Sequence, residues 1–342
     1  MHFSSQRAAA FAGLAALGLA ALAPSAAQAQ DLFVANGNSS TISRFANTGP
    51  GTFSQNSTTL SGGALSSPQG LAFDAQGDLF AANFNSNTIT EFAAGLTPGS
   101  LKAGVVVAAS TTGLNGPIGL AVDAKGNLFT TNGNGSTITE FAALGGGSFG
   151  PAQSIGSGLK GPVGLAVDTG GDLFAANFST GTITEFAAGA GGTFAGGTTV
   201  ASGLVDPEGL ALDAVGNLFA SNYLAGTVTE FAFTPGTNGA TGTFGVGALY
   251  AAGLSRAVGL AFDAQGDLFA ASFSTGTITK FAAGAAPGGT GTVVESGLSG
   301  PTFLAFSPVP AVPEASTTVS LGLLLALGLG GLVMAARKKR AA

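Results

Sequence analysis

The stretch PQGLAFDAQGDLFAANF at residues 68–84, followed by TITEF at 88–92, decides the fold because the chain repeats it. Close copies of this unit occupy residues 117–141, 162–186, 207–231 and 257–281. Successive copies begin about 45 to 50 residues apart, which is the length typical of a repeat with four short strands. Most of the 342-residue chain is therefore expected to be one repeat array.

Each unit is predicted to consist of strands, because glycine and β-branched residues are frequent and no helical periodicity is present. Residues 70–73 form the first predicted strand, and 79–84 form a second that is apolar on both faces, as in a strand buried between sheets. A third strand follows at 88–91, and a weaker fourth precedes the next unit. The aspartates that recur between the first two strands are predicted to be turn residues: Asp74, Asp123, Asp168, Asp213 and Asp263.

The two ends of the array complete each other. Residues 31–45 form a unit that lacks its first strand, whereas residues 300–306 form a first strand without the rest. An open array would leave both fragments as unpaired edges, but a ring lets them pair. The sequence therefore predicts an all-β fold, a six-bladed β-propeller over residues 30–307 that is closed by pairing of its N- and C-terminal segments.

The pattern GLAFDAQGDLFAAN resembles NHL-type repeats and the lactonase and streptogramin-lyase propellers similar to them, over roughly Asp31 to Phe306. NHL units usually carry Asp at the end of the second strand, whereas this chain has Ser272 in one copy and asparagine in the others. These asparagines are predicted to satisfy neighbouring backbone groups, with a pore ring that binds ligand as the alternative role: Asn36, Asn83, Asn132, Asn177 and Asn222.

The N-terminus is typical of a secretory signal peptide over residues 1–29. Arg7 supplies a positive charge, residues 8–23 are apolar, and Ala27 and Ala29 are the small residues that signal peptidase needs. We therefore expect export and a mature chain that begins at Gln30. The alternative is a retained anchor helix.

Residues 308–342 are typical of a C-terminal sorting signal. A proline-rich linker leads to a short motif, then to an apolar run long enough to span a bilayer at 319–336, and then to a basic cluster at 337–340. The predicted sorting motif is Val312, Pro313 and Glu314, followed by Ala315 where the usual motif has a second proline.

This order of elements resembles the PEP-CTERM sorting signal of Gram-negative bacteria. The resemblance implies recognition by an exosortase and a role linked to exopolysaccharide and biofilm. It also implies an inner-membrane anchor through the C-terminal transmembrane helix, followed by release to the cell surface or the extracellular space. The alternative is a plain anchor that is never cleaved.

Composition excludes several kinds of chemistry. The chain has no cysteine, and its single histidine, His2, lies in the predicted signal peptide. The mature chain therefore lacks a Ser-His-Asp triad, a histidine-ligated zinc site and a histidine base. Residues 30–295 contain 16 acidic and 6 basic residues, a formal charge of −10, which disfavours nucleic acid and favours cations or neutral glycans.

One copy departs from the repeat in residues that suit a binding site. Asp206 and Glu208 flank its proline, and Tyr223 replaces the usual phenylalanine after Asn222. Antiparallel pairing should bring these four residues together, near the loop that carries Arg256. Carboxylate and amide oxygens suit Ca²⁺, and a tyrosine ring suits stacking on a sugar. Unrelated surface drift is the alternative.

The sequence thus predicts an exported propeller that acts as a binding or structural module of the cell envelope or extracellular matrix. Its expected partners are signal peptidase and exosortase for processing, and a glycan or another envelope protein as ligand. Enzymatic activity is left open and disfavoured. The alternative is a metal-dependent propeller hydrolase or lactonase. No cofactor is required, although Ca²⁺ would suit the carboxylate pair.

Overall fold

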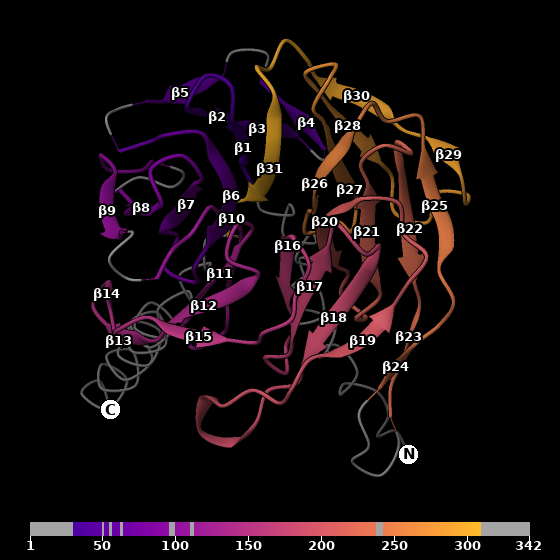
Figure 1. The fold of residues 1–342 in the computed structure, drawn as a ribbon. Helices are drawn as coiled ribbons and strands as arrows, with labels where there is room; N and C mark the ends of the chain where they lie inside the picture. Colours follow the sequence, from indigo (N-terminus) through magenta and orange to yellow (C-terminus); the bar gives the residue numbers. More distant parts are fainter. Residues whose placement is uncertain are drawn as a thin grey trace, which may run out of the picture. The chain divides into compact units, whose positions relative to one another are not determined.

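The computed structural model describes residues 30–49, 51–54, 57–61, 64–95, 100–109, 113–236 and 242–308. Across these residues the chain forms six large sheets, the blades, that are arranged around a common axis (Figure 1). The predicted six-bladed β-propeller is confirmed. The predicted signal peptide and the predicted sorting segment after Pro308 lie outside the described residues.

Each blade has four antiparallel strands, which are given below in their order from the axis outward; their numbers follow the chain. Blade 1 contains β31 (Pro301–Phe306), β1 (Leu32–Asn36), β2 (Thr41–Phe45) and β5 (Thr58–Leu60). Blade 2 contains β6 (Pro68–Phe73), β7 (Leu79–Asn83), β8 (Thr88–Phe92) and β9 (Val105–Ala108). Blade 3 contains β10 (Pro117–Val122), β11 (Leu128–Asn132), β12 (Thr137–Phe141) and β15 (Gln153–Ile155).

The other three blades repeat this order. Blade 4 contains β16 (Pro162–Val167), β17 (Leu173–Asn177), β18 (Thr182–Phe186) and β19 (Thr198–Ala201). Blade 5 contains β20 (Pro207–Leu212), β21 (Leu218–Asn222), β22 (Thr227–Phe231) and β25 (Ala248–Ala252), to which β29 (Gly289–Thr290) adds a parallel strand. Blade 6 contains β26 (Ala257–Phe262), β27 (Leu268–Ser272), β28 (Thr277–Phe281) and β30 (Thr292–Glu295).

Short hairpins decorate three of the blades: β3 (Asn47–Gly49) with β4 (Thr52–Phe53), β13 (Ala143–Gly145) with β14 (Ser148–Phe149), and β23 (Phe233–Thr234) with β24 (Thr243–Phe244). A 3-10 turn lies at Ala190–Gly192. Within the described ranges, no helix is long and apolar enough to cross a membrane.

The innermost strands contact one another in a closed ring, in the order β31, β6, β10, β16, β20, β26 and back to β31. Glycine at the third position of these strands permits the close approach. A Cβ atom on Gly209 of β20 would lie only 2.1 Å from the carbonyl oxygen of Val258 on β26. Four other innermost strands also have glycine at this position, and β31 has Phe303 instead.

The hydrophobic core lies between the blades. Six clusters of buried apolar residues each join two neighbouring blades within the described ranges. All five residues of each second strand are buried, which explains why these strands are apolar on both faces. Each blade therefore depends on both neighbours to cover its faces.

The recurring aspartates close the turn between the first and second strands. Asp74 Oδ1 accepts the backbone N–H groups of Gln76 at 3.0 Å and Asp78 at 2.8 Å. Gly77 completes this turn with φ of +89°, a left-handed value that favours glycine. The equivalent aspartates of blades 3 to 6 make the same pair of hydrogen bonds, so their predicted role as turn residues is confirmed.

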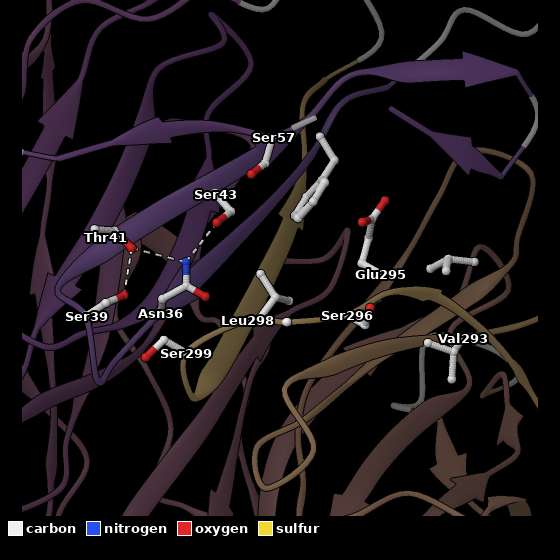
Figure 2. A pocket seen from close by; sticks show the side chains of 13 residues that line it. Asn36, Ser39, Thr41, Ser43, Ser57, Val293, Glu295, Ser296, Leu298 and Ser299 are labelled. Carbon is white, nitrogen blue, oxygen red and sulfur yellow. Dashed lines mark hydrogen bonds between the residues drawn. The ribbon is translucent and has the colours of Figure 1, made fainter. Parts of the chain in front are cut away.

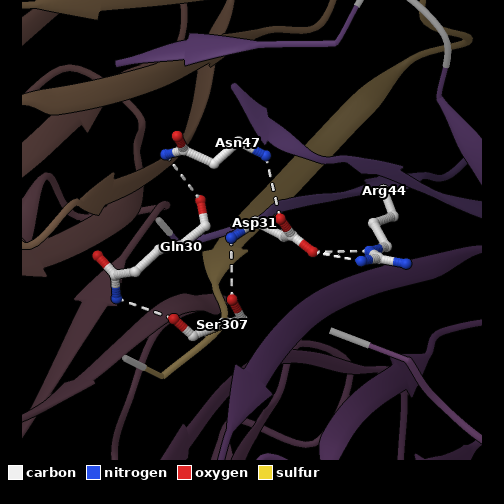
Figure 3. Close-up of polar contacts among 5 residues, drawn as sticks. All are labelled: Gln30, Asp31, Arg44, Asn47 and Ser307. Carbon is white, nitrogen blue, oxygen red and sulfur yellow. Dashed lines mark hydrogen bonds and ion pairs between the residues drawn. The ribbon is translucent and has the colours of Figure 1, made fainter. Parts of the chain in front are cut away.

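The first and last strands of the propeller meet in blade 1, where β1 pairs antiparallel with β31, as predicted. Figure 3 shows the polar contacts that hold this seam. Asp31 receives a hydrogen bond from Arg44 Nε at 2.8 Å, and its own N–H donates to Ser307 Oγ at 2.9 Å. Gln30 Nε2 donates to the Ser307 carbonyl at 2.8 Å, and Asn47 Nδ2 donates to the Gln30 carbonyl at 3.2 Å.

Candidate functional site

The four predicted site residues of blade 5 lie where β20 begins and β21 ends. We call them the blade-5 cluster: Asp206, Glu208, Asn222 and Tyr223. Pro207 stands opposite Asn222 in the register of these strands. The Tyr223 N–H donates to the Asp206 carbonyl at 3.1 Å, so the two flanking residues are held side by side. Glu208 follows on β20, one of the strands that surround the axis.

The residue before each innermost strand adopts a left-handed conformation. Glycine fills this position in three blades, with φ of +61°, +59° and +60° at Gly116, Gly161 and Gly300. Ser67, Asp206 and Arg256 adopt it in blades 2, 5 and 6, with φ of +51°, +50° and +55°. A non-glycine residue costs roughly 1 kcal/mol or more in this conformation. Two neighbouring blades therefore present charged side chains at a strained position.

Tyr223 joins these blades through its ring. The Arg256 guanidinium carbon lies 5.5 Å from the ring centroid, within the range of a cation–π contact. The Phe178 ring of blade 4 also meets Tyr223 edge to face, with 6.4 Å between the ring centroids. Val205 and Leu224, which adjoin the cluster in sequence, are 50% and 65% exposed. Aromatic, apolar and charged groups are thus gathered on this part of the surface.

Glu208 is the electrostatically unusual member of the cluster. Burial raises the pKa of its carboxyl from 4.5 to about 8, and the nearby Asp206 charge adds to the rise. Among the described residues, no hydrogen bond to this carboxyl offsets the loss of water. The side chain is half-buried, so it remains open to a small donor group.

The asparagines of the predicted pore ring are buried and directed toward their own blades. Asn222 Oδ1 accepts the Val205 N–H at 3.1 Å, and Asn222 Nδ2 donates to Thr227 and Thr229. The asparagines of blades 2 to 4 form the same arrangement. Asn36 keeps both donor contacts, but its Oδ1 is buried without a hydrogen-bond partner.

The blade-5 cluster offers few side chains that could coordinate a metal ion. Within the described ranges, no group of three or more His, Cys, Asp or Glu side chains is placed to hold a metal ion. Asp206 and Glu208 supply two carboxyl groups, whereas the Asn222 amide oxygen is already used by Val205.

The interface between blades 6 and 1, beside the seam, contains a residue that sequence analysis missed. Glu295, at the end of β30, is only 6% exposed, and its Oε1 is buried without a hydrogen-bond partner. It lines a cavity of about 440 Å³ between blades 6 and 1 (Figure 2). The signal was present in the repeat, since VESGL at 294–298 corresponds to VASGL at 200–204.

No protein-family model matches the chain, and neither does any curated relative. Solved propellers do resemble it. A chain in a nidogen/laminin complex matches with a TM-score of 0.62 and 16% identity, covering 81% of this chain and 98% of that one. A putative 6-phosphogluconolactonase from Bacteroides fragilis matches with a TM-score of 0.57 and 19% identity, covering 82% and 99%.

A functionally unknown protein from Desulfotomaculum acetoxidans matches with a TM-score of 0.55 and 13% identity, covering 81% of this chain and 98% of that one. At these identities the likeness shows the propeller fold alone. The similar structures include a member of a binding complex and a putative lactonase, so they do not separate binding from catalysis.

Proposed function

We propose that this chain is an exported, non-catalytic propeller that binds a neutral glycan at the cell envelope or in the extracellular matrix. Export follows from the signal-like segment at 1–29, and the segment at 308–342 makes the chain an exosortase substrate. Signal peptidase and exosortase are then its processing partners. The sorted protein is delivered to the cell surface or the extracellular space of a Gram-negative bacterium.

The observation that carries the binding role is the Tyr223 ring, which contacts both Arg256 and Phe178. A sugar presents an apolar C–H face that packs on an aromatic ring, and hydroxyl groups that hydrogen-bond to charged side chains around it. Glu208 is half-buried on β20, one of the six strands around the propeller axis. Among the described residues, its carboxyl group accepts no hydrogen bond. The excess of acidic residues in the propeller favours a neutral rather than an anionic glycan.

Isothermal titration of the full-length protein with neutral oligosaccharides tests this role. We expect Tyr223→Ala to weaken binding at least tenfold, which is about 1.4 kcal/mol. Phe84→Ala is the matched control, because Phe84 occupies the equivalent position of blade 2 without the neighbouring charges. Equal affinities of the wild type and Tyr223→Ala would contradict this placement of the site. Absence of binding by the wild type would contradict the function itself.

A further inference from the structure

Blades 6 and 1 line a half-open polar cavity beside the blade in which the ring closes. Its volume is about 440 Å³, within the size range of small-molecule sites. Figure 2 shows Asn36, Thr41 and Ser43 on the blade-1 side, and on the blade-6 side Glu295 at the end of β30 with Ser296 and Leu298 just after it. The cavity is therefore made by two distant parts of the sequence.

Hydroxyl groups dominate the lining. Six side chains contribute them: Ser39, Thr41, Ser43, Ser57, Ser296 and Ser299. Glu295 is the one charged residue among the lining residues, and no cationic side chain accompanies it. An anionic ligand would be repelled by this surface, whereas a ligand with several hydroxyl groups would find both donors and acceptors.

Two acceptors in the cavity lack donors. Asn36 is 3% exposed, and the Asn36 Oδ1 atom has no hydrogen-bond partner. The equivalent oxygen of Asn83 accepts the backbone N–H of Ser66 at 3.1 Å, so blade 1 has lost a bond that blade 2 makes. Glu295 Oε1 is the second acceptor without a partner. A buried acceptor without a donor is unfavourable, and a ligand hydroxyl group would satisfy it once a small rotation of the side chain turns the oxygen to the cavity.

Glu295 also departs from the repeat pattern. It stands opposite Ile278 in the register of the third and fourth strands of blade 6. The equivalent fourth-strand residues of the other blades are all apolar: Leu60, Ala108, Ile155, Ala201 and Ala251. The fold therefore accommodates an apolar residue at this position, and the carboxyl group is not needed to build the blade.

We propose that the cavity at the seam is a second binding site, independent of the blade-5 cluster, which takes one neutral sugar residue or a polyol of similar size. Glu295 and Asn36 accept hydrogen bonds from ligand hydroxyl groups, and the serine and threonine hydroxyls complete the ring of contacts. Phe45 and Leu298, which also line the cavity, supply apolar surface for the C–H groups of the ligand.

Saturation-transfer NMR and isothermal titration of the full-length protein test this site with a panel of D-glucose, D-galactose, N-acetylglucosamine and their methyl glycosides. We expect at least one of these sugars to bind in the millimolar range or tighter. Glu295→Ala should weaken that binding at least tenfold. Glu185→Gln is the matched control, because it removes a carboxylate from the opposite side of the ring and should leave affinity unchanged.

Two further measurements distinguish a ligand site at the seam from a structural role of Glu295. Glu295→Ala restores the residue of blades 2, 4 and 5, so its melting temperature should equal or exceed that of the wild type. A marked drop would show that the carboxyl is structural and would overturn the proposal. A lack of binding by the whole panel of sugars would also overturn the proposal. Tyr223→Ala should leave sugar binding at the seam intact. Failure of the proposed seam site can therefore be distinguished from failure of the proposed site at the blade-5 cluster.

Discussion

Replacing Glu208 by glutamine tests whether a carboxyl group beside the axis of the propeller is held in its neutral form. The substitution keeps the size of the side chain and removes its titration. Burial is the main reason why the pKa of Glu208 rises from 4.5 to about 8, and the charge of Asp206 is the second. The amide should therefore behave like the protonated acid at every pH.

The sign of the effect follows from proton linkage. Below pH 4.5 the carboxyl is protonated in both the folded and the unfolded chain, so its contribution to stability is complete. As the pH rises toward about 8, the unfolded chain ionises first, and the free energy of unfolding falls. A difference of about 3.5 between the two pKa values corresponds to at most roughly 5 kcal/mol. Because Glu208 is only half-buried, water screens its charge, and we expect about 2–3 kcal/mol.

Urea unfolding of the wild type and Glu208→Gln near pH 5 and near pH 9 measures this difference. The two proteins should be about equally stable near pH 5, and the variant should be more stable near pH 9. Glu230→Gln on the same blade is the comparison rather than a neutral control, because burial also raises the pKa of Glu230. Glu295, whose pKa burial raises to about 7, titrates in the same window but contributes equally to wild type and variant. The reasoning is refuted if Glu208→Gln and the wild type lose stability in parallel between the two pH values.

Three other perturbations test the ring and the predicted processing. Removing residues 301–306 takes away the innermost strand of blade 1 and its buried apolar residues, so thermal unfolding should show a loss of several kcal/mol; unchanged melting would contradict ring closure. Gly209→Ala should destabilise by about 2 kcal/mol or more in urea unfolding, because its Cβ would meet Val258 O, whereas Gly196→Ala has open space and should be nearly neutral. Glu314→Ala should leave an uncut precursor in the membrane fraction, and mass spectrometry that finds the basic tail on the mature native protein would count against cleavage.

The fold could be predicted because repetition makes each local signal count several times. No single copy of the unit distinguishes a sandwich from a propeller. The decisive residues were the incomplete units at 31–45 and 300–306, since two fragments that complete one blade require a closed ring. The glycine at the third position of five innermost strands was visible in the sequence, but the reason for it was not. Only the distance from Gly209 to the neighbouring carbonyl shows that it permits the contact between blades.

The candidate site could be predicted only in part. Asp206 and Tyr223 stood out because they differ from the equivalent residues of other copies, and antiparallel pairing placed them together. The backbone strain at Asp206 and Arg256 is seen only in the structure, which gives both residues a positive φ. Glycine would adopt this conformation without that strain. The high pKa of Glu208 also depends on the packing of neighbouring innermost strands, which the sequence does not specify.

Glu295 was missed because a departure from a repeat has meaning only when the burial of that position is known. The fourth strands are the least regular part of the unit, and β30 has exposed residues, such as Val293 at 56%. An acidic residue there resembles ordinary surface variation. Its register opposite Ile278 shows that it occupies a position that holds apolar residues in every other blade. Stability alone would favour an apolar residue at that position, so the carboxyl group is better explained by a ligand that the cavity receives.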